Sequence, residues 1–203
     1  MFAMLDRRVR QMHLALADAK TSDLSSLEIE RAVTAEGFYC AINFNEGTSE
    51  AELANVATLL VANIACMKDH LKVWCKKNSS PFEGDNLINT NGSVAIVHDL
   101  WNTDKHAELT TPPRSGHRPR LENLKRVLRL SSGDQAGSGS FFSFDPRTGT
   151  VLTGTSGSGA VQLALDAQVV DEHSSPLGDF TTLCEQAIAA WEQELKKAGV
   201  PLQ

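Results

Sequence analysis

Apolar residues near the start of the chain recur at steps of three and four, the spacing of one face of an α-helix. Leu5, Val9, Met12 and Leu16 follow this spacing and predict a helix over residues 2–19. The polar stretch that follows indicates a break.

Residues 28–45 carry two patterns. Residues 28–36 are compatible with the start of another helix. From Phe38 to Phe44, bulky apolar side chains occupy every second position, which predicts a strand. A short buried helix over residues 36–45 is the alternative.

The strongest helical pattern begins with a capping box, Ser49 followed by Glu52. Neither glycine nor proline interrupts the run that continues to Lys77, and its apolar positions alternate at threes and fours. This pattern predicts one long helix, which needs a packing partner along its length.

A second apolar helix is expected from Ser93, as its N-cap, to about Leu109. Residues 78–91 contain proline and glycine and predict a loop between the two helices. Helices joined in this way favour antiparallel packing, the start of a bundle. Residues 110–113, Thr-Thr-Pro-Pro, end the second helix.

After a basic segment at 114–120, the spacing of Leu121, Leu124 and Leu128 predicts a short helix. Residues 131–140 are rich in glycine and serine, which is typical of a flexible linker or a long turn.

The segments that follow this linker are predicted to be strands. Residues 141–144 and 150–153 flank Asp-Pro-Arg-Thr-Gly, a turn sequence that predicts a β-hairpin. A glycine-rich turn at 154–159 precedes a third strand at 160–170. The glycine-rich turn lacks the Gly-Lys-Ser/Thr ending of a phosphate-binding loop, and a strand follows it where that loop needs a helix.

A second capping box, Thr182 with Glu185, predicts a closing helix that ends at Gly199. The expected fold class is therefore α+β: an antiparallel helical bundle, a small antiparallel sheet made of the hairpin plus one or two strands, and a C-terminal helix. We expect a mainly helical part at 1–130 and a hairpin-plus-helix part at 131–203, packed together as one compact unit.

Composition narrows the class of protein. The chain has 203 residues, of which 41% are hydrophobic and 22% charged, so it can build a core and is not wholly disordered. The formal net charge of −6 gives no overall attraction to nucleic acid or anionic lipid. The chain has no unbroken run of eighteen apolar residues and no signal-peptide pattern, so we expect a cytoplasmic protein of bacterial type without a membrane span.

The cysteines indicate packing rather than chemistry. No two of them form a C-x-x-C pair, so a disulfide or a metal site is not expected, and we interpret them as buried small hydrophobes in a reducing compartment. The four are Cys40, Cys66, Cys75 and Cys184.

The main candidate for chemistry is the polar side of the second helix. His98, Asn102 and His106 are spaced by four and stack in one line, with Asp99 and Lys105 beside them. In a catalytic interpretation His106 is the acid or base, and Asn102 and Lys105 hold an anion. The alternative is an exposed or interfacial polar face. Two histidines and an amide are too few for a closed zinc site, so neither a metal nor another cofactor is expected.

The same residues carry a family resemblance. Trp-Asn-Thr-Asp-Lys-His at 101–106 resembles the Arg-x4–6-His element of HEPN-domain proteins, over roughly residues 50–130. In that family two such helices meet across a dimer, and Arg and His cleave RNA through its 2′-OH without metal. Asn102 matches the polar position and His106 the catalytic His, while Trp101 stands in place of the Arg. The resemblance therefore implies a homodimeric, non-catalytic relative.

His70 lies at the border of the apolar seam of the first long helix, next to Asp69. If the two core helices run antiparallel, both side chains could face His98 and orient its imidazole. The alternative is a histidine whose polar atoms are satisfied at a helix–helix border.

Cations cluster after the second helix, where only Glu122 opposes them. Such a segment can follow a phosphate backbone, or it can pair with acidic groups of the chain itself or of a partner. No aromatic residues are interspersed to stack on bases. The candidate binding residues here are Arg114, Arg118, Arg120 and Arg126, with His117, Lys125 and Arg129 nearby.

Together these features predict an intracellular binding or interaction protein, HEPN-like and non-catalytic, that contacts RNA or a protein partner through the polar helix face and the basic segment. The alternative is a metal-independent ribonuclease in which His106 is the acid or base, and Lys105 or an arginine of the basic segment replaces the missing Arg.

Overall fold

The computed structural model of the chain describes residues 2–21, 24, 28–34, 37–44, 49–105 and 111–201, which form six helices and eight strands. The fold is α+β, as predicted. Two units are distinguishable: Met1–Ala19, Ala54–Leu124 and Asp166–Gln203 make the first, and Lys20–Leu53 and Lys125–Leu165 the second. This division differs from the expected border at residue 130, because the closing helix packs with the helices of the first unit.

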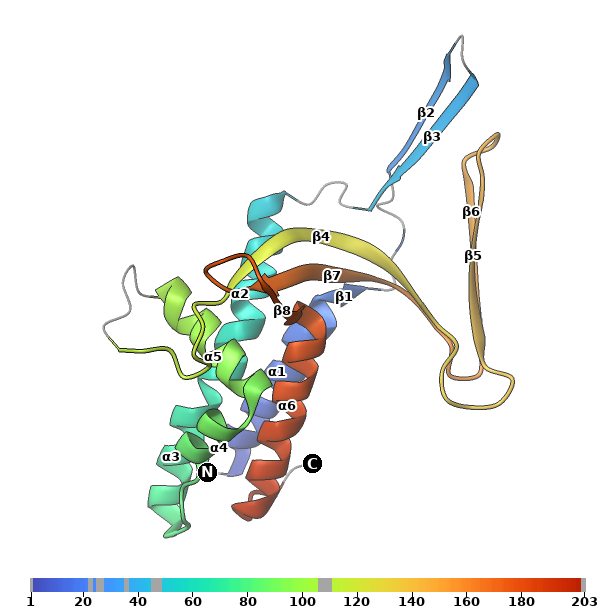
Figure 1. Cartoon of the computed structure of the whole chain (residues 1–203). Helices are drawn as coiled ribbons and strands as arrows, with labels where there is room; N and C mark the ends of the chain where they lie inside the picture. Colours follow the sequence, from blue (N-terminus) through green and yellow to red (C-terminus); the bar gives the residue numbers. More distant parts are fainter. Residues whose placement is uncertain are drawn as a thin grey trace. The chain divides into compact units, whose positions relative to one another are not determined.

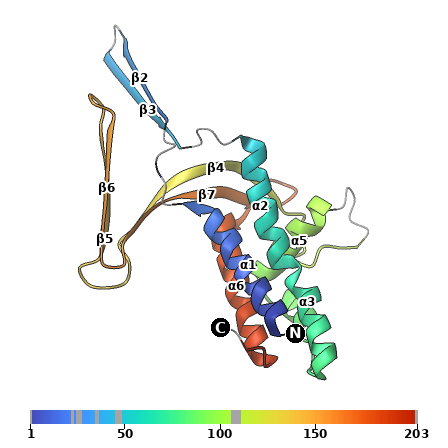
Figure 2. The same cartoon turned by 180° about the vertical axis from the view of Figure 1, so that it is seen from behind.

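Five helices of the first unit pack against one another. The last helix contacts the first, fourth and fifth, and the third contacts the first and fourth. Figures 1 and 2 show the first and last helices side by side and running in opposite directions. These helices are α1 (Phe2–Asp18), α3 (Met67–Asn78), α4 (Gly84–Thr90), α5 (Gly92–Lys105) and α6 (Phe180–Lys197).

The predicted long helix is two helices, α2 (Glu50–Ala65) and α3, which are separated by Cys66 alone. Cys66 keeps right-handed backbone angles and its N–H still donates to Ala62, so the interruption is slight. The predicted capping box is confirmed: the Ser49 hydroxyl accepts from the Glu52 N–H at 3.2 Å, and the Ser49 N–H donates to the Glu52 carboxylate at 2.7 Å.

This helical segment also bears on the membrane question. By length and composition Glu50–Asn78 could cross a membrane, because an 18-residue window within it has a mean hydropathy of 1.3. In this protein 39% of that window is buried, and core helices of soluble proteins pass the same test of length and composition. It is therefore weak evidence for a membrane span.

The expected loop at 78–91 was wrong in part, because it contains α4. Ile88 of this helix is fully buried, which offsets the cost of ordering such a short segment. Asn91, rather than Ser93, caps the next helix: its side chain accepts from the Val94 N–H at 3.0 Å. The Ser93 hydroxyl instead donates to Gln186 of α6.

The short helix expected at 121–128 was wrong, since this segment is strand β4 (Arg120–Ser131). Asn123 has φ 58°, a left-handed value that a helix does not accommodate. The strand is also paired in a sheet of order β1–β7–β4, in which β7 is Ala160–Val170, as predicted. Pairing with a neighbouring strand thus overrides the leucine spacing.

The remaining strands of this sheet are short. β1 (Lys20–Thr21) and β8 (Pro176–Asp179) both pair with β7 in antiparallel fashion. The predicted strand at 160–170 thus belongs to this sheet, whereas the predicted hairpin forms a separate sheet.

Two further sheets are antiparallel hairpins of two strands each. β2 (Glu28–Thr34) pairs with β3 (Gly37–Asn43), so the helix expected from residue 28 was wrong and the strand predicted from the alternation is confirmed. β5 (Gly139–Asp145) pairs with β6 (Thr150–Ser156), which confirms the second hairpin.

The closing helix begins earlier than predicted. The Asp179 carboxylate accepts from the Thr182 N–H at 2.8 Å and from its hydroxyl at 2.6 Å, so Asp179 is the N-cap rather than Thr182. The predicted end is confirmed, because Gly199 has φ 85° and the Val200 N–H donates back to Leu195. Burial raises the thiol pKa of Cys75 and of Cys184, and both lie in the core as predicted.

Candidate functional site

The first two members of the predicted polar line on α5, His98 and Asn102, are in contact. The Asn102 side-chain amide donates to His98 Nδ1 across one helical turn, at 3.0 Å. Lys105 is exposed at the last turn of the helix. His106, the predicted acid or base, lies outside the described residues, so the geometry of the site is established for His98 and Asn102 alone.

Asp99 is buried, with 1% of its surface exposed, and its role is structural. One carboxylate oxygen accepts from both the backbone N–H and the hydroxyl of Ser115, each at 2.7 Å. Burial works against the charged form. However, the neighbouring His98 and the donors of Ser115 and of the Arg114 backbone together outweigh it and hold the pKa of Asp99 below its ordinary value. The predicted binding residue thus fixes the segment after α5.

His70 is partly buried on α3. Burial lowers the pKa of its imidazole, and Arg8 of α1 lowers it further, while Asp69 works in the opposite direction. The charges that act on His70 therefore come from α1 and α3. That it faces His98 stays a prediction.

Arg114 fastens the basic segment to α4. Its guanidinium donates to Asn89 at 2.8 Å and to the Asp85 carboxylate at 3.1 Å. Lys68 of α3 reaches the same carboxylate at 2.9 Å. Lys68, followed by Arg114, outweighs partial burial and holds the pKa of Asp85 below its ordinary value. Arg114 therefore connects this segment to α4 directly, and to α3 through the Asp85 carboxylate that it shares with Lys68.

The next two arginines contact the turn that joins β7 to β8. The Arg118 backbone N–H donates to Glu172 at 3.0 Å. The Arg120 guanidinium donates to the Asp171 carbonyl at 2.8 Å and to Ser174 at 2.7 Å, and it also pairs with Glu122 at 2.8 Å. These bonds join segments that lie more than fifty residues apart in the sequence.

Two carboxylates pair with the basic side chains of this region. Asp85 pairs with Lys68 and Arg114, and Glu122 pairs with Arg120. Glu172 accepts from the Arg118 backbone, and Arg120 also binds the backbone carbonyl of Asp171. The guanidinium groups of Arg114 and Arg120 are thus engaged within the chain. Arg126, the fourth predicted binding residue, belongs to the second unit, where its charge acts on Glu52.

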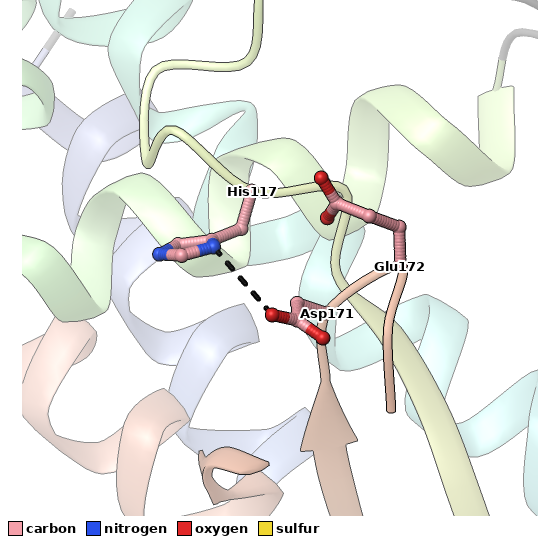
Figure 3. A group of neighbouring side chains, drawn as sticks. All are labelled: His117, Asp171 and Glu172. Atoms are coloured by element: carbon pink, nitrogen blue, oxygen red, sulfur yellow. Dashed lines mark ion pairs between the residues drawn. The ribbon is translucent and has the colours of Figure 1, made fainter. Parts of the chain in front are cut away.

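A cluster that the sequence did not reveal lies beside these contacts. His117, Asp171 and Glu172 each offer one potential ligand atom, and these atoms lie within 4.8 Å of one another (Figure 3). The His117 Nδ1 and an Asp171 oxygen are 4.0 Å apart. The sequence contains no short metal-ligand motif for this group, because His117 precedes β4 and the two acids follow β7. Only the pairing of those strands in one sheet could have indicated it.

Neither a protein-family model, nor a curated protein, nor a solved structure matches this chain. Its function is therefore inferred from the geometry of the site alone.

Proposed function

We propose that this chain is a cytoplasmic, HEPN-like, non-catalytic binding protein that contacts a protein partner through the polar side of α5 and the segment 114–120. The observation that carries the proposal is that the guanidinium groups of Arg114 and Arg120 are already paired with carboxylates of the chain. A surface that binds a nucleic-acid backbone needs unmatched cations, because its affinity comes from neutralising phosphates. Paired charges of both signs instead suit a partner that offers the complementary pattern.

The polar line on α5 supports binding over catalysis. Cleavage through a 2′-OH requires a base together with a group that stabilises the phosphorane. Asn102, the candidate anion holder, is engaged with His98, and Trp101 stands at the family's Arg position. A rigid pair of hydrogen-bonded side chains serves recognition without a reactive centre.

The partner that we propose is a second copy of the chain. Val94, Val97 and Leu100, on the apolar side of α5, are buried within one chain, so that side is not open to another molecule. A homodimer related by two-fold symmetry would therefore use the polar side, which both copies present.

Multi-angle light scattering after gel filtration tests the dimer. The wild-type protein should show about twice the chain mass of 22.0 kDa. Lys105→Glu should weaken the dimer at least about fivefold, because it reverses a charge within the proposed interface. Lys196→Glu, an exposed lysine on α6, is the matched control and should behave as wild type. A monomer at every concentration would contradict the dimer.

The nucleic-acid alternatives are tested separately. Labelled single-stranded RNA and transfer RNA should remain intact and unshifted in EDTA at low and moderate salt. Cleavage that disappears in His106→Ala would instead establish the ribonuclease. A low-salt shift that disappears in Arg118→Ala would establish an RNA-binding protein.

A further inference from the structure

We propose that His117, Asp171 and Glu172 form a binding site for a single divalent transition-metal ion of the Zn²⁺ class, with one ligand atom from each side chain. All three residues belong to the first unit. The proposal does not depend on the proposed function, and its failure would leave that function untouched.

The first argument is an unused carboxylate oxygen. Asp171 is only 7% exposed, and its Oδ1 accepts the backbone N–H groups of His173 and Ser175 at 2.9 and 2.8 Å. Its Oδ2 points toward His117 and accepts no hydrogen bond from the described residues. Because only 10% of the side chain is exposed, water stabilises this charged oxygen in part, and a cation beside it would be favourable.

The second argument is the distance to His117. The hydrogen-bonded pair of His13 and Glu192 has a separation of 2.6 Å. His117 instead stands 4.0 Å from Asp171, and neither of its ring nitrogens donates to or accepts from the described residues. The separation exceeds a hydrogen bond and is of the size that a bridging ion would span.

The third argument is that the turn carrying the two acids is held in place before any ion arrives. The Arg118 backbone N–H fixes one oxygen of Glu172 and leaves the other available. Arg120 holds the Asp171 carbonyl and Ser174, which fixes the turn that carries both acids. Such supporting bonds reduce the ordering cost of binding.

The donor set selects the class of ion. Asp171 and Glu172 carry carboxyl groups, which are ordinarily ionised near neutral pH. Two carboxylates and one neutral imidazole neutralise a divalent ion. A mixed nitrogen and oxygen set favours Zn²⁺ over Mg²⁺ or Ca²⁺, which prefer oxygen alone.

The geometry requires only a small closure. Ligand atoms around a tetrahedral zinc ion lie roughly 3.4 Å apart, given bonds of about 2.0–2.1 Å. The three atoms therefore need to approach one another by about 1 Å. Rotation of the Glu172 and His117 side chains can supply this, since Glu172 is exposed and His117 half-exposed.

Isothermal titration of the EDTA-treated full chain with ZnCl₂ tests the proposal. Wild-type protein should bind one ion, whereas His117→Ala and Glu172→Gln should each lose at least about tenfold in affinity. His13→Ala, a histidine paired elsewhere on the surface, is the matched control and should bind as wild type. The same titration with MgCl₂ should give no comparable binding.

Other results would overturn the site. Equal zinc affinity in wild type and His117→Ala would place the ion elsewhere, and Cys66→Ser would then show whether the partly exposed thiol is the ligand. The absence of zinc binding at concentrations up to about 100 μM would also refute the site. Thermal unfolding gives a second readout, since zinc should raise the Tm of wild type by several degrees but not that of His117→Ala.

Discussion

The helical unit and the β5–β6 hairpin of this protein reach order by different means. In the helical unit, α6 alone buries ten side chains, among them Trp191, Phe180 and Leu195. In the hairpin no residue of either strand is fully buried. The first region is stabilised by the removal of apolar surface from water, the second by a backbone ladder and a turn.

The contrast explains where large side chains are tolerated in solvent. Phe141 and Leu152 lie on the same face of the hairpin and are 55% and 58% exposed. The ring of Phe141 covers Gly154 on the opposite strand, where a β-carbon would collide with it. An aromatic ring over a cross-strand glycine stabilises a sheet locally, without a core. The same truncation should therefore have very different consequences in the two regions.

Trp191→Ala should give the largest effect. The side chain is 1% exposed and packs near Gly84 of α4, so its removal leaves a cavity between α4 and α6. We expect the free energy of unfolding to fall by about 3–5 kcal/mol, measured by urea denaturation. Trp191→Phe should cost clearly less, since the indole N–H has no partner among the described residues. An equal loss in both variants would contradict the cavity explanation.

Asp99→Ala should give the next largest effect, because it leaves the Ser115 N–H and hydroxyl without their acceptor. We expect a loss of about 1–3 kcal/mol at pH 7. The folded state holds the pKa of Asp99 below the unfolded value. Its contribution is therefore present above about pH 4 and is lost as the pH falls through the folded pKa.

Urea denaturation at a series of pH values checks this prediction. The gap in stability between wild type and Asp99→Ala should narrow below pH 4. The control is Asp104→Ala, an exposed carboxylate on the same helix, which should show a small effect without this pH dependence. A gap that stays constant down to pH 2 would mean that the Asp99 charge is not what stabilises the segment.

Local signals predicted much of the helical unit but little of its polar site. The capping box at Ser49 and the glycine stop at Gly199 were predicted because each acts within one turn of its own helix. The helix predicted from Leu121, Leu124 and Leu128 was wrong, because this spacing is also compatible with a strand once β7 is available as a partner. Sequence analysis therefore failed where the competing interaction lies far along the chain.

The site shows the same limit. The sequence left open whether Arg114 and Arg120 contact a phosphate backbone or pair within the chain. Their partners are carboxylates on α4 and β4 and a backbone carbonyl in the turn after β7. His117 lacks any nearby ligand motif, although the fold brings Asp171 and Glu172 beside it. Pairings of this kind depend on strand order, which apolar periodicity does not encode.

In the hairpin, the turn should matter more than any apolar side chain. Gly149 has φ 76°, and its N–H donates to Asp145 at 2.8 Å to close the turn. Gly149→Ala forces an L-residue into this left-handed conformation and should cost about 1 kcal/mol of local stability. Amide hydrogen exchange of β5 and β6 should report it, while exchange in α6 stays unchanged. Faster exchange in α6 as well would show that the hairpin and the helices unfold together.

Phe141→Ala should have the smallest effect and is the direct counterpart of Trp191→Ala. Because more than half of the ring is already in water, its removal forfeits mainly the contact with Gly154. We expect a local loss of about 0.5 kcal/mol, the size of one cross-strand pair, again measured by hydrogen exchange in β5 and β6. A loss approaching that of Trp191→Ala would mean that Phe141 is buried in solution, and that the hairpin, like α6, depends on a core.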